Sequence, residues 1–188
     1  FVCYLLIISF FNKLVQALTH PSSMYDSKYT VIISSYQKLE FIGDSVLDYV
    51  ITYYIYNQNC SLRPCQISNL RAAMVNNFFY ASVVVKYGLH KYIRYQSIAL
   101  REIIVKFVSK FNTKYFEQLK HLLFESIDED DNLDGELSSD QIDEVDAPKV
   151  LSDVFEALIG AIYIDSCFSL NTVWQVVFRM IKLEIGMI

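Results

Sequence analysis

Glycine and proline are scarce in this sequence, with 5 and 3 occurrences in 188 residues. A chain with so few turn-forming residues is a poor candidate for a fold of many short strands joined by tight turns. Long stretches with apolar residues at helical spacing take up most of the chain, and 53% of all residues are apolar. The sequence therefore predicts an all-α fold, and its length suits one domain with an insertion.

The paired cysteine and histidine spacings of a zinc site are also missing. Cys60 and Cys65 have no matching second pair, and the three histidines are scattered along the chain. A di-iron helical bundle needs Glu-x-x-His motifs, and none of the histidines lies in one. Four cysteines without such a pattern are best interpreted as free thiols in a reducing compartment, so we expect a cytoplasmic protein.

Residues 1–11 form an almost wholly apolar run without a basic segment before it or a small-residue cleavage site after it. The run is not expected to be a signal peptide, and it is too short to span a bilayer. We interpret it as an N-terminal tail or the edge of a fragment that docks on the domain, and we expect no membrane partner. Residues 12–186 are then expected to form a single domain.

Negative charge is concentrated in one segment, although the whole chain has a net charge of only −5. Residues 117–146 contain 12 acidic residues and one lysine, whereas the rest of the chain has 15 basic and 9 acidic residues. The composition of residues 121–146 predicts a solvated, disordered insertion, most simply a flexible loop. The remaining surface is more basic than the total suggests, which is compatible with a nucleic-acid partner.

Apolar periodicity and capping residues define the expected helices. Ser97 and Ser169 are suitable N-caps, and Pro148 suits a first helical turn. Gly88 is the type of residue expected just after a helix end. Helices are expected over residues 12–19, 35–57, 65 or 68 to 87, 97–119, 148–164 and 169–181, with a short helical turn over residues 89–94.

Residues 36–49 alternate apolar residues with acids at a helical spacing. Glu40, Asp44 and Asp48 stand at i, i+4 and i+8, so they form one acidic stripe on an otherwise apolar helix. Carboxylates at this spacing repel one another, and they do so more strongly when they are removed from water. We therefore expect a cation on this stripe.

A second acidic pair, Asp153 and Glu156, lies three residues apart on another apolar helix. If this pair packs against Glu40 and Asp44, the four carboxylates offer oxygen ligands that suit Mg²⁺ or Mn²⁺ rather than zinc. A metal held in this way can activate water for attack on phosphorus. The alternative for each pair is a solvated helix face, which helices as apolar as these do not favour.

Lys149 lies one turn before Asp153, in a first turn where a lysine opposes the helix dipole. Its ammonium group can balance the carboxylates or meet a phosphate. The alternative is a lysine that is simply solvated at the start of the helix.

Four motifs resemble those of ribonuclease III, and they occur in that family's order over residues 11–182. The most specific is LEFIGDSVLD at residues 39–48; the others are ALTHPS at 17–22, RAAMVNN at 71–77 and DVFEALIGAIY at 153–163. The acidic insertion, YGLHKY at 87–92 and LNTVWQV at 170–176 are similar to the second, C-terminal ribonuclease III domain of Dicer-type proteins.

The resemblance implies the ribonuclease III helical fold and a metal-dependent endoribonuclease. Such a domain hydrolyses phosphodiester bonds in one strand of double-stranded RNA and leaves 5′-phosphate and 3′-hydroxyl ends, here in small-RNA biogenesis as part of a Dicer-like protein. Mg²⁺ is the implied cofactor, with Mn²⁺ as a substitute, and Lys149 matches a lysine at the active site. The implied catalytic and metal-binding residues are Glu40, Asp44, Asp153 and Glu156.

The resemblance also implies supporting residues and partners. Asn76 and Arg71 are expected to approach RNA or to order the site, and Asp48 is expected to support the site without binding the metal. The implied partners are double-stranded RNA and a second ribonuclease III domain, in the same chain of a longer protein or in a homodimer. The alternative is a non-catalytic RNA-binding or scaffolding domain on the same fold; the presence of all four acids favours the enzyme.

Overall fold

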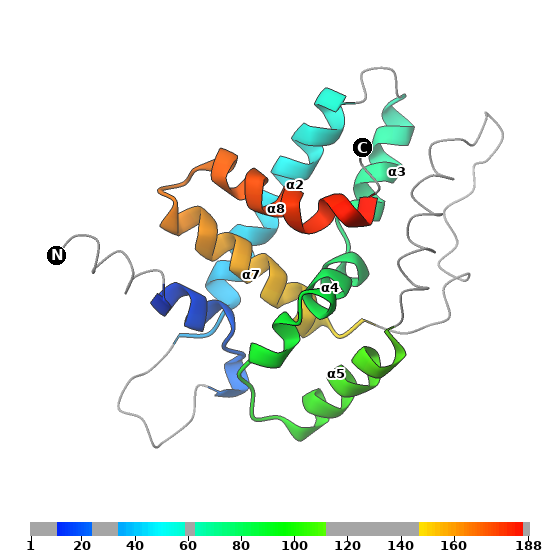
Figure 1. Cartoon of the computed structure of the whole chain (residues 1–188). Helices are drawn as coiled ribbons and strands as arrows, with labels where there is room; N and C mark the ends of the chain where they lie inside the picture. The colour runs from blue at the N-terminus through cyan, green and yellow to red at the C-terminus, as the bar shows by residue number, and fades with distance from the viewer. Residues whose placement is uncertain (1–10, 24–33, 59–62, 112–146, 186–188) are drawn as a thin grey trace.

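The computed structural model describes residues 11–23, 34–58, 63–111 and 147–185, with side chains described as far as residue 182. These parts of the chain are helical, and Thr19 and Arg94 form an isolated β-bridge. The all-α prediction is therefore confirmed (Figure 1). After a helical segment over residues 11–17 come η1 (Pro21–Ser23), α2 (Gln37–Gln58), α3 (Pro64–Met74), α4 (Asn77–Lys86), η2 (Leu89–Tyr92), α5 (Ile98–Lys110), α7 (Lys149–Asp165) and α8 (Leu170–Ile185), where η marks a short 3₁₀ helix.

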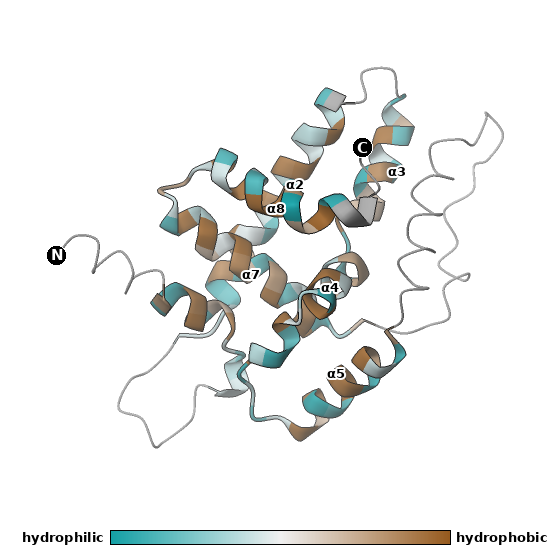
Figure 2. Ribbon diagram, in the orientation of Figure 1, coloured by the Kyte–Doolittle hydropathy of each residue, from teal (hydrophilic) through white to brown (hydrophobic). Residues whose placement is uncertain are grey.

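Helix α7 forms the centre of the fold. It packs most extensively on α2, and α4 and α8 also lie against it (Figure 1). Nearly all of α7 from Val150 to Ala161 is buried, because its sequence is apolar around most of the helix circumference. Figure 2 shows the contrast with α5, a peripheral helix that has both hydrophobic and hydrophilic residues along its surface. The helix that carries the second acidic pair is thus a core helix.

Two glycines let α2 and α7 approach closely. A Cβ atom at Gly43 would lie on the main-chain carbonyl of Glu156, and a Cβ atom at Gly160 would lie on the carbonyl of Leu39. Main-chain atoms in a packed helix pair have no room to move aside, so a side chain at either glycine would separate the helices. The glycines thereby determine which turn of α2 faces which turn of α7.

The helix expected up to residue 87 is in fact two helices, so the prediction of one continuous helix is wrong. The break falls at Asn76, which adopts an extended backbone (φ −148°, ψ 159°). Its side-chain oxygen accepts a hydrogen bond from the Phe79 amide at 2.8 Å, and its side-chain nitrogen donates to the carbonyls of Ala72 and Ala73. Asparagine interrupts a helix in this way because its side chain satisfies main-chain groups on both sides of the break.

Two other expected helix ends are confirmed, and a third differs by one residue. Ser97 accepts a hydrogen bond from the Leu100 amide as the N-cap of α5. Gly88 follows the last turn of α4 with a positive φ of 68°, which is the backbone region that glycine favours. Pro148 is the N-cap residue of α7 instead of a member of its first turn, and Lys149 is therefore the first helical residue.

Some of the sequence-based predictions lie outside the described residues. They concern residues 1–10 of the apolar tail, the acidic insertion at residues 121–146, and the continuation of α5 toward residue 119. A search of the described helices finds none that is both long enough and apolar enough to cross a membrane.

Candidate active site

The crossing of α2 and α7 brings acidic residues of the two helices together. One carboxylate oxygen from each of Glu40, Asp153 and Glu156 lies within 4.8 Å of the other two. Glu40 is three residues before Gly43, and Glu156 is four residues before Gly160, so the close approach at the glycines sets this spacing. Asp153 and Glu156 are only 7% and 8% exposed. Two of the three carboxyl groups are therefore largely shielded from water.

Asp44, the fourth predicted ligand, lies outside this group of three. It stands one turn after Glu40 on α2, and its side chain is exposed. Its negative charge nevertheless raises the pKa of Glu156, which places it close to the group. The structure thus brings three of the four predicted carboxylates together and leaves the fourth beside them in contact with solvent.

Lys149 is a cation in contact with the carboxylates. Its Nζ donates a hydrogen bond to Asp153 Oδ1 at 2.5 Å and another to Glu40 Oε1 at 3.2 Å. The hydrogen bond to Asp153 is the main cause of the raised pKa of Lys149. Because 67% of the lysine side chain is exposed, the ammonium group is also accessible from solvent. Lys149 therefore balances the charge of two of the acids, Glu40 and Asp153, which agrees with the expectation that its ammonium group can balance the carboxylates.

The Glu156 carboxyl is the most strongly perturbed acid of the group. Burial raises the pKa of Glu156 to about 8, the charges of Asp44, Asp153 and Glu40 add to the increase, and Lys149 opposes it. A carboxyl in this setting keeps its proton near neutral pH unless another cation replaces that proton. The donor set consists of oxygen atoms, which are the ligands that Mg²⁺ and Mn²⁺ prefer. The residues present therefore fit a hard divalent cation.

Tyr36 is a site residue that the sequence pattern did not reveal. Its buried hydroxyl donates a hydrogen bond to Asp153 Oδ2 at 3.1 Å, so it holds the oxygen that Lys149 does not contact. Burial, followed by the charge of Asp153, raises the pKa of Tyr36. His20 lies edge-on to the Tyr36 ring at 5.8 Å, and its Nδ1 accepts a hydrogen bond from the Ser22 amide. The sequence shows only that a tyrosine stands just before the acidic helix. It does not show the contact with Asp153, because Asp153 is 117 positions away.

The other predicted site residues hold helices together. Arg71 Nη1 forms an ion pair with Asp48 Oδ1 at 2.6 Å, which ties α3 to α2, and each side chain is 46% exposed. Asn76 uses its amide group to cap α4. None of these three residues belongs to the carboxylate group. Their contact with RNA stays a prediction.

A comparison with known protein families identifies this arrangement. The family model described as "Ribonuclease III domain" matches residues 37–166, a range that runs from the start of α2 through α7. The chain belongs to the ribonuclease III family. Both helices that carry the acids lie within the matched range.

Relatives of this ribonuclease III domain include much longer proteins. "Endoribonuclease Dicer" of Danio rerio is 40% identical over 181 residues, which cover 93% of this chain and 9% of that protein. "Endoribonuclease Dcr-1" of Drosophila melanogaster is 38% identical over 174 residues, which cover 93% of this chain and 7% of that protein. The chain thus spans less than a tenth of the length of these two Dicer proteins.

Solved structures of another ribonuclease III nuclease domain show the same fold. The nuclease domain from Campylobacter jejuni superimposes with a TM-score of 0.59 at 24% sequence identity, over 97% of this chain and 95% of that chain. A second structure from the same organism gives a TM-score of 0.58 and covers 97% of each chain. The helical arrangement described above is therefore that of the family.

Proposed function

We propose that this ribonuclease III domain is a divalent-metal-dependent endoribonuclease that cuts one strand of double-stranded RNA and leaves 5′-phosphate and 3′-hydroxyl ends. The observation that supports this most directly is the group of Glu40, Asp153 and Glu156 at the helix crossing, with Asp44 beside it. Carboxylates that lie so close together need compensating positive charge. Lys149 offsets only part of their negative charge, because the pKa of Glu156 stays raised beside it. Family membership indicates that the substrate is an RNA phosphodiester.

The proposed cofactor is Mg²⁺, with Mn²⁺ as a substitute. When bound, the metal supplies an activated water and neutralises negative charge on the phosphate during hydrolysis. Tyr36 keeps Asp153 oriented through its hydrogen bond, and the exposed ammonium group of Lys149 is accessible to a phosphate oxygen. The residues assigned to the metal are Glu40, Asp44, Asp153 and Glu156.

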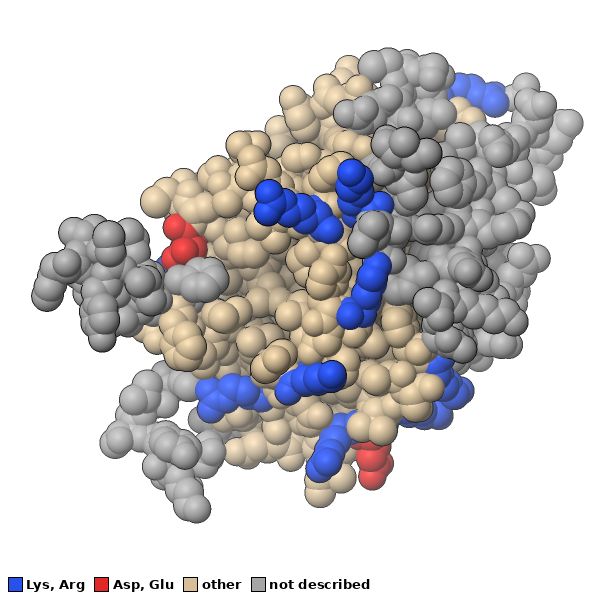
Figure 3. Space-filling model, in the orientation of Figure 1, with Lys and Arg blue, Asp and Glu red and all other residues tan. Residues whose placement is uncertain are grey.

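Cations that suit an RNA backbone are present on the described surface. Figure 3 shows a face on which many Lys and Arg side chains and few Asp and Glu side chains are visible. Lys91 and Arg94 are exposed at and just after η2, and within the described chain neither forms an ion pair. Proteins contact A-form RNA chiefly through its phosphates and 2′-hydroxyl groups. We therefore assign Lys91 and Arg94 to phosphate contacts.

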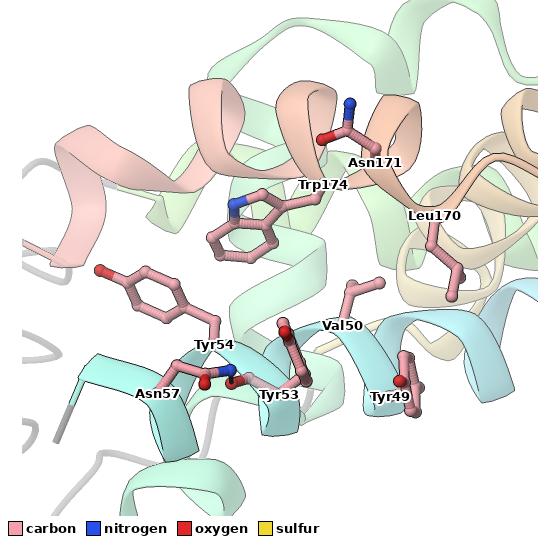
Figure 4. Close-up of a pocket in the computed structure, with 8 residues that line it drawn as sticks. All are labelled: Tyr49, Val50, Tyr53, Tyr54, Asn57, Leu170, Asn171 and Trp174. Carbon is pink, nitrogen blue, oxygen red and sulfur yellow. Dashed lines mark hydrogen bonds between the residues drawn. The ribbon is translucent and has the colours of Figure 1, made fainter. Parts of the chain in front are cut away.

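Aromatic residues on α2 support a second partner, another ribonuclease III domain. Phe41, Tyr53 and Tyr56 are 80%, 60% and 68% exposed, and Tyr49 is 55% exposed. Figure 4 shows Tyr49 and Tyr53 at a groove of about 540 Å³ that Trp174 of α8 also lines. Exposed aromatic side chains gathered in this way are typical of protein interfaces. One of the two Campylobacter jejuni nuclease-domain structures is described as showing structural flexibility in a region involved in dimer formation.

Sedimentation of the 188-residue chain tests this pairing. We expect a weak homodimer whose dissociation rises with dilution, and we expect Phe41→Glu to shift the population to monomer because it places a charge in the interface. Lys106→Glu, a change at an exposed position of α5 outside this aromatic face, is the comparison for a charge effect alone. A monomeric wild type at concentrations on the order of 100 μM would contradict the pairing.

The proposed setting is the second, C-terminal ribonuclease III domain of a Dicer-like protein that acts in small-RNA biogenesis in the cytoplasm. The motifs at residues 87–92 and 170–176 support this position. The exposed free thiols of Cys65 and Cys167 suit a reducing compartment. We take residues 12–186 as one domain, which extends the matched range of 37–166 at both ends.

Cleavage of a long RNA duplex by the 188-residue chain tests the proposed activity. We expect the wild type to cut with Mg²⁺ and not with EDTA, and we expect Glu156→Gln and Asp44→Asn to stop cutting because each removes a carboxylate from the metal site. Glu102→Gln, on the exposed side of α5, is the matched control and should cut like the wild type. Cutting that survives both site changes contradicts the assignment. No cutting by a folded, dimeric wild type favours a non-catalytic RNA-binding or scaffolding domain.

A further inference from the structure

A tyrosine hydroxyl is buried beside the carboxylate group without a hydrogen-bond partner. Tyr80 of α4 is only 2% exposed, and no group in the described part of the chain accepts a hydrogen bond from its hydroxyl. Buried hydroxyl groups are nearly always hydrogen-bonded, because leaving one unpaired lowers the stability of the fold. The Tyr80 hydroxyl is therefore available to donate a hydrogen bond to a nearby acceptor.

The Tyr80 ring packs against the turn of α7 that carries Glu156. The ring stacks on Phe155 with centroids 5.0 Å apart and an angle of 29° between the planes. Phe155 precedes Glu156 in α7, and α4 packs directly against this helix. After burial, the negative charges of Glu156, Asp44 and Asp48 are the causes that raise the pKa of Tyr80. Tyr80 thus lies near carboxylates from both α2 and α7.

Glu156 lacks the donor that Asp153 has. The Asp153 carboxylate accepts hydrogen bonds from Tyr36 and Lys149. Across the described chain, by contrast, no group donates a hydrogen bond to the Glu156 carboxyl. Carboxylates that bind a metal are usually held by a hydrogen bond from a neighbouring group, and loss of such a bond typically lowers metal affinity by about 10- to 100-fold. Glu156 needs a donor and Tyr80 needs an acceptor.

We propose that Tyr80 is a positioning residue of this site, and that its hydroxyl donates a hydrogen bond to the Glu156 carboxylate when this carboxylate binds a divalent cation. The proposal rests on the assignment of Glu156 as a metal ligand. In the cation-bound protein the hydroxyl gains its missing partner, and the carboxylate is held in one orientation toward the metal. Tyr80 contacts no reacting atom and acts only through Glu156.

The change Tyr80→Phe separates this role from ordinary packing, because it removes only the hydroxyl. In EDTA, the variant should be as stable as the wild type or more stable, since the unpaired group is gone. In a Mn²⁺ titration followed by calorimetry, it should bind about 10-fold more weakly than the wild type. A merely structural tyrosine would not give these opposite effects. Tyr92→Phe, at an exposed position in η2, is the matched control and should change neither quantity.

The same measurements distinguish failure of this proposal from failure of the proposed function. Mn²⁺ binding by the wild type that is lost in Glu156→Gln supports the metal site itself. If that result holds and Tyr80→Phe binds Mn²⁺ within about twofold of the wild type, the positioning role is wrong while the metal site stands. If the wild type does not bind Mn²⁺, or Glu156→Gln binds it equally well, both proposals are wrong. A variant destabilised in EDTA would show that the hydroxyl already has a structural role, which also contradicts the proposal.

Discussion

The buried carboxyl of Glu156 makes the stability of this domain depend on pH, and Glu156→Gln tests that dependence. The pKa of Glu156 in the folded chain is about 8, above its ordinary value of 4.5. Between these values the folded chain keeps a proton that the unfolded chain has released. The free energy of unfolding therefore falls as pH rises through this window, and it is level below about 4.5 and above about 8.

The size of the effect follows from the width of the window. One pH unit inside it lowers the free energy of unfolding by up to about 1.4 kcal/mol. From pH 5.5 to 7.5 the wild type should therefore lose up to about 2.7 kcal/mol relative to Glu156→Gln, which has no proton to release. Burial lowers the pKa of His20 and of His90, but both histidines are present in both proteins, so their contributions cancel in the difference.

Urea unfolding in EDTA, followed by circular dichroism at several pH values, measures this difference. Glu102→Gln carries the same chemical change at an exposed position of α5, and its curve should run parallel to that of the wild type. A difference between wild type and Glu156→Gln that stays constant from pH 5.5 to 7.5 would refute the argument that Glu156 is buried and protonated. With Mn²⁺ in place of EDTA, the wild type should gain stability that the variant does not, because only the folded site binds the metal.

Four further changes test the crossing, a cap and the orientation of Asp153. Gly43→Ala and Gly160→Ala should each lower the free energy of unfolding by about 2–3 kcal/mol, because the new methyl group meets a main-chain carbonyl; an unchanged urea midpoint would contradict the close approach. Ser97→Ala removes the N-cap of α5 and should cost about 1 kcal/mol in the same assay, and no loss would mean that the cap is unimportant. Tyr36→Phe leaves an Asp153 oxygen without its donor and should weaken Mn²⁺ binding about 10-fold by calorimetry; equal affinity would show that the bond does not position the ligand.

Local spacing alone predicted which acids of the site share a helix face. A helix has 3.6 residues per turn, so Glu40 shares a face with Asp44, and Asp153 shares a face with Glu156, whatever the helices pack against. The N-cap at Ser97 was predictable for the same reason, because the serine and the amide it accepts from are three residues apart. Such features need no knowledge of the rest of the fold.

Spacing misled at the junction of α3 and α4. Apolar residues continue at helical intervals through this region, so periodicity predicted one helix. The side chain of Asn76 ends that helix, because it hydrogen-bonds to main-chain groups on both sides of itself. A competing local hydrogen bond is a stronger determinant of the break than the apolar pattern around it.

The sequence by itself determined the helical class, the family and the acidic residues that the site draws on. Only the tertiary structure decided which acids meet: the glycine crossing brings Glu40 against Asp153 and Glu156, whereas Asp44 stays in solvent beside them. It also decided that Tyr36 reaches Asp153. The physical reason is that positions on one helix are related by local geometry, whereas contacts between distant helices depend on how the whole core packs, and no short stretch of sequence encodes that packing.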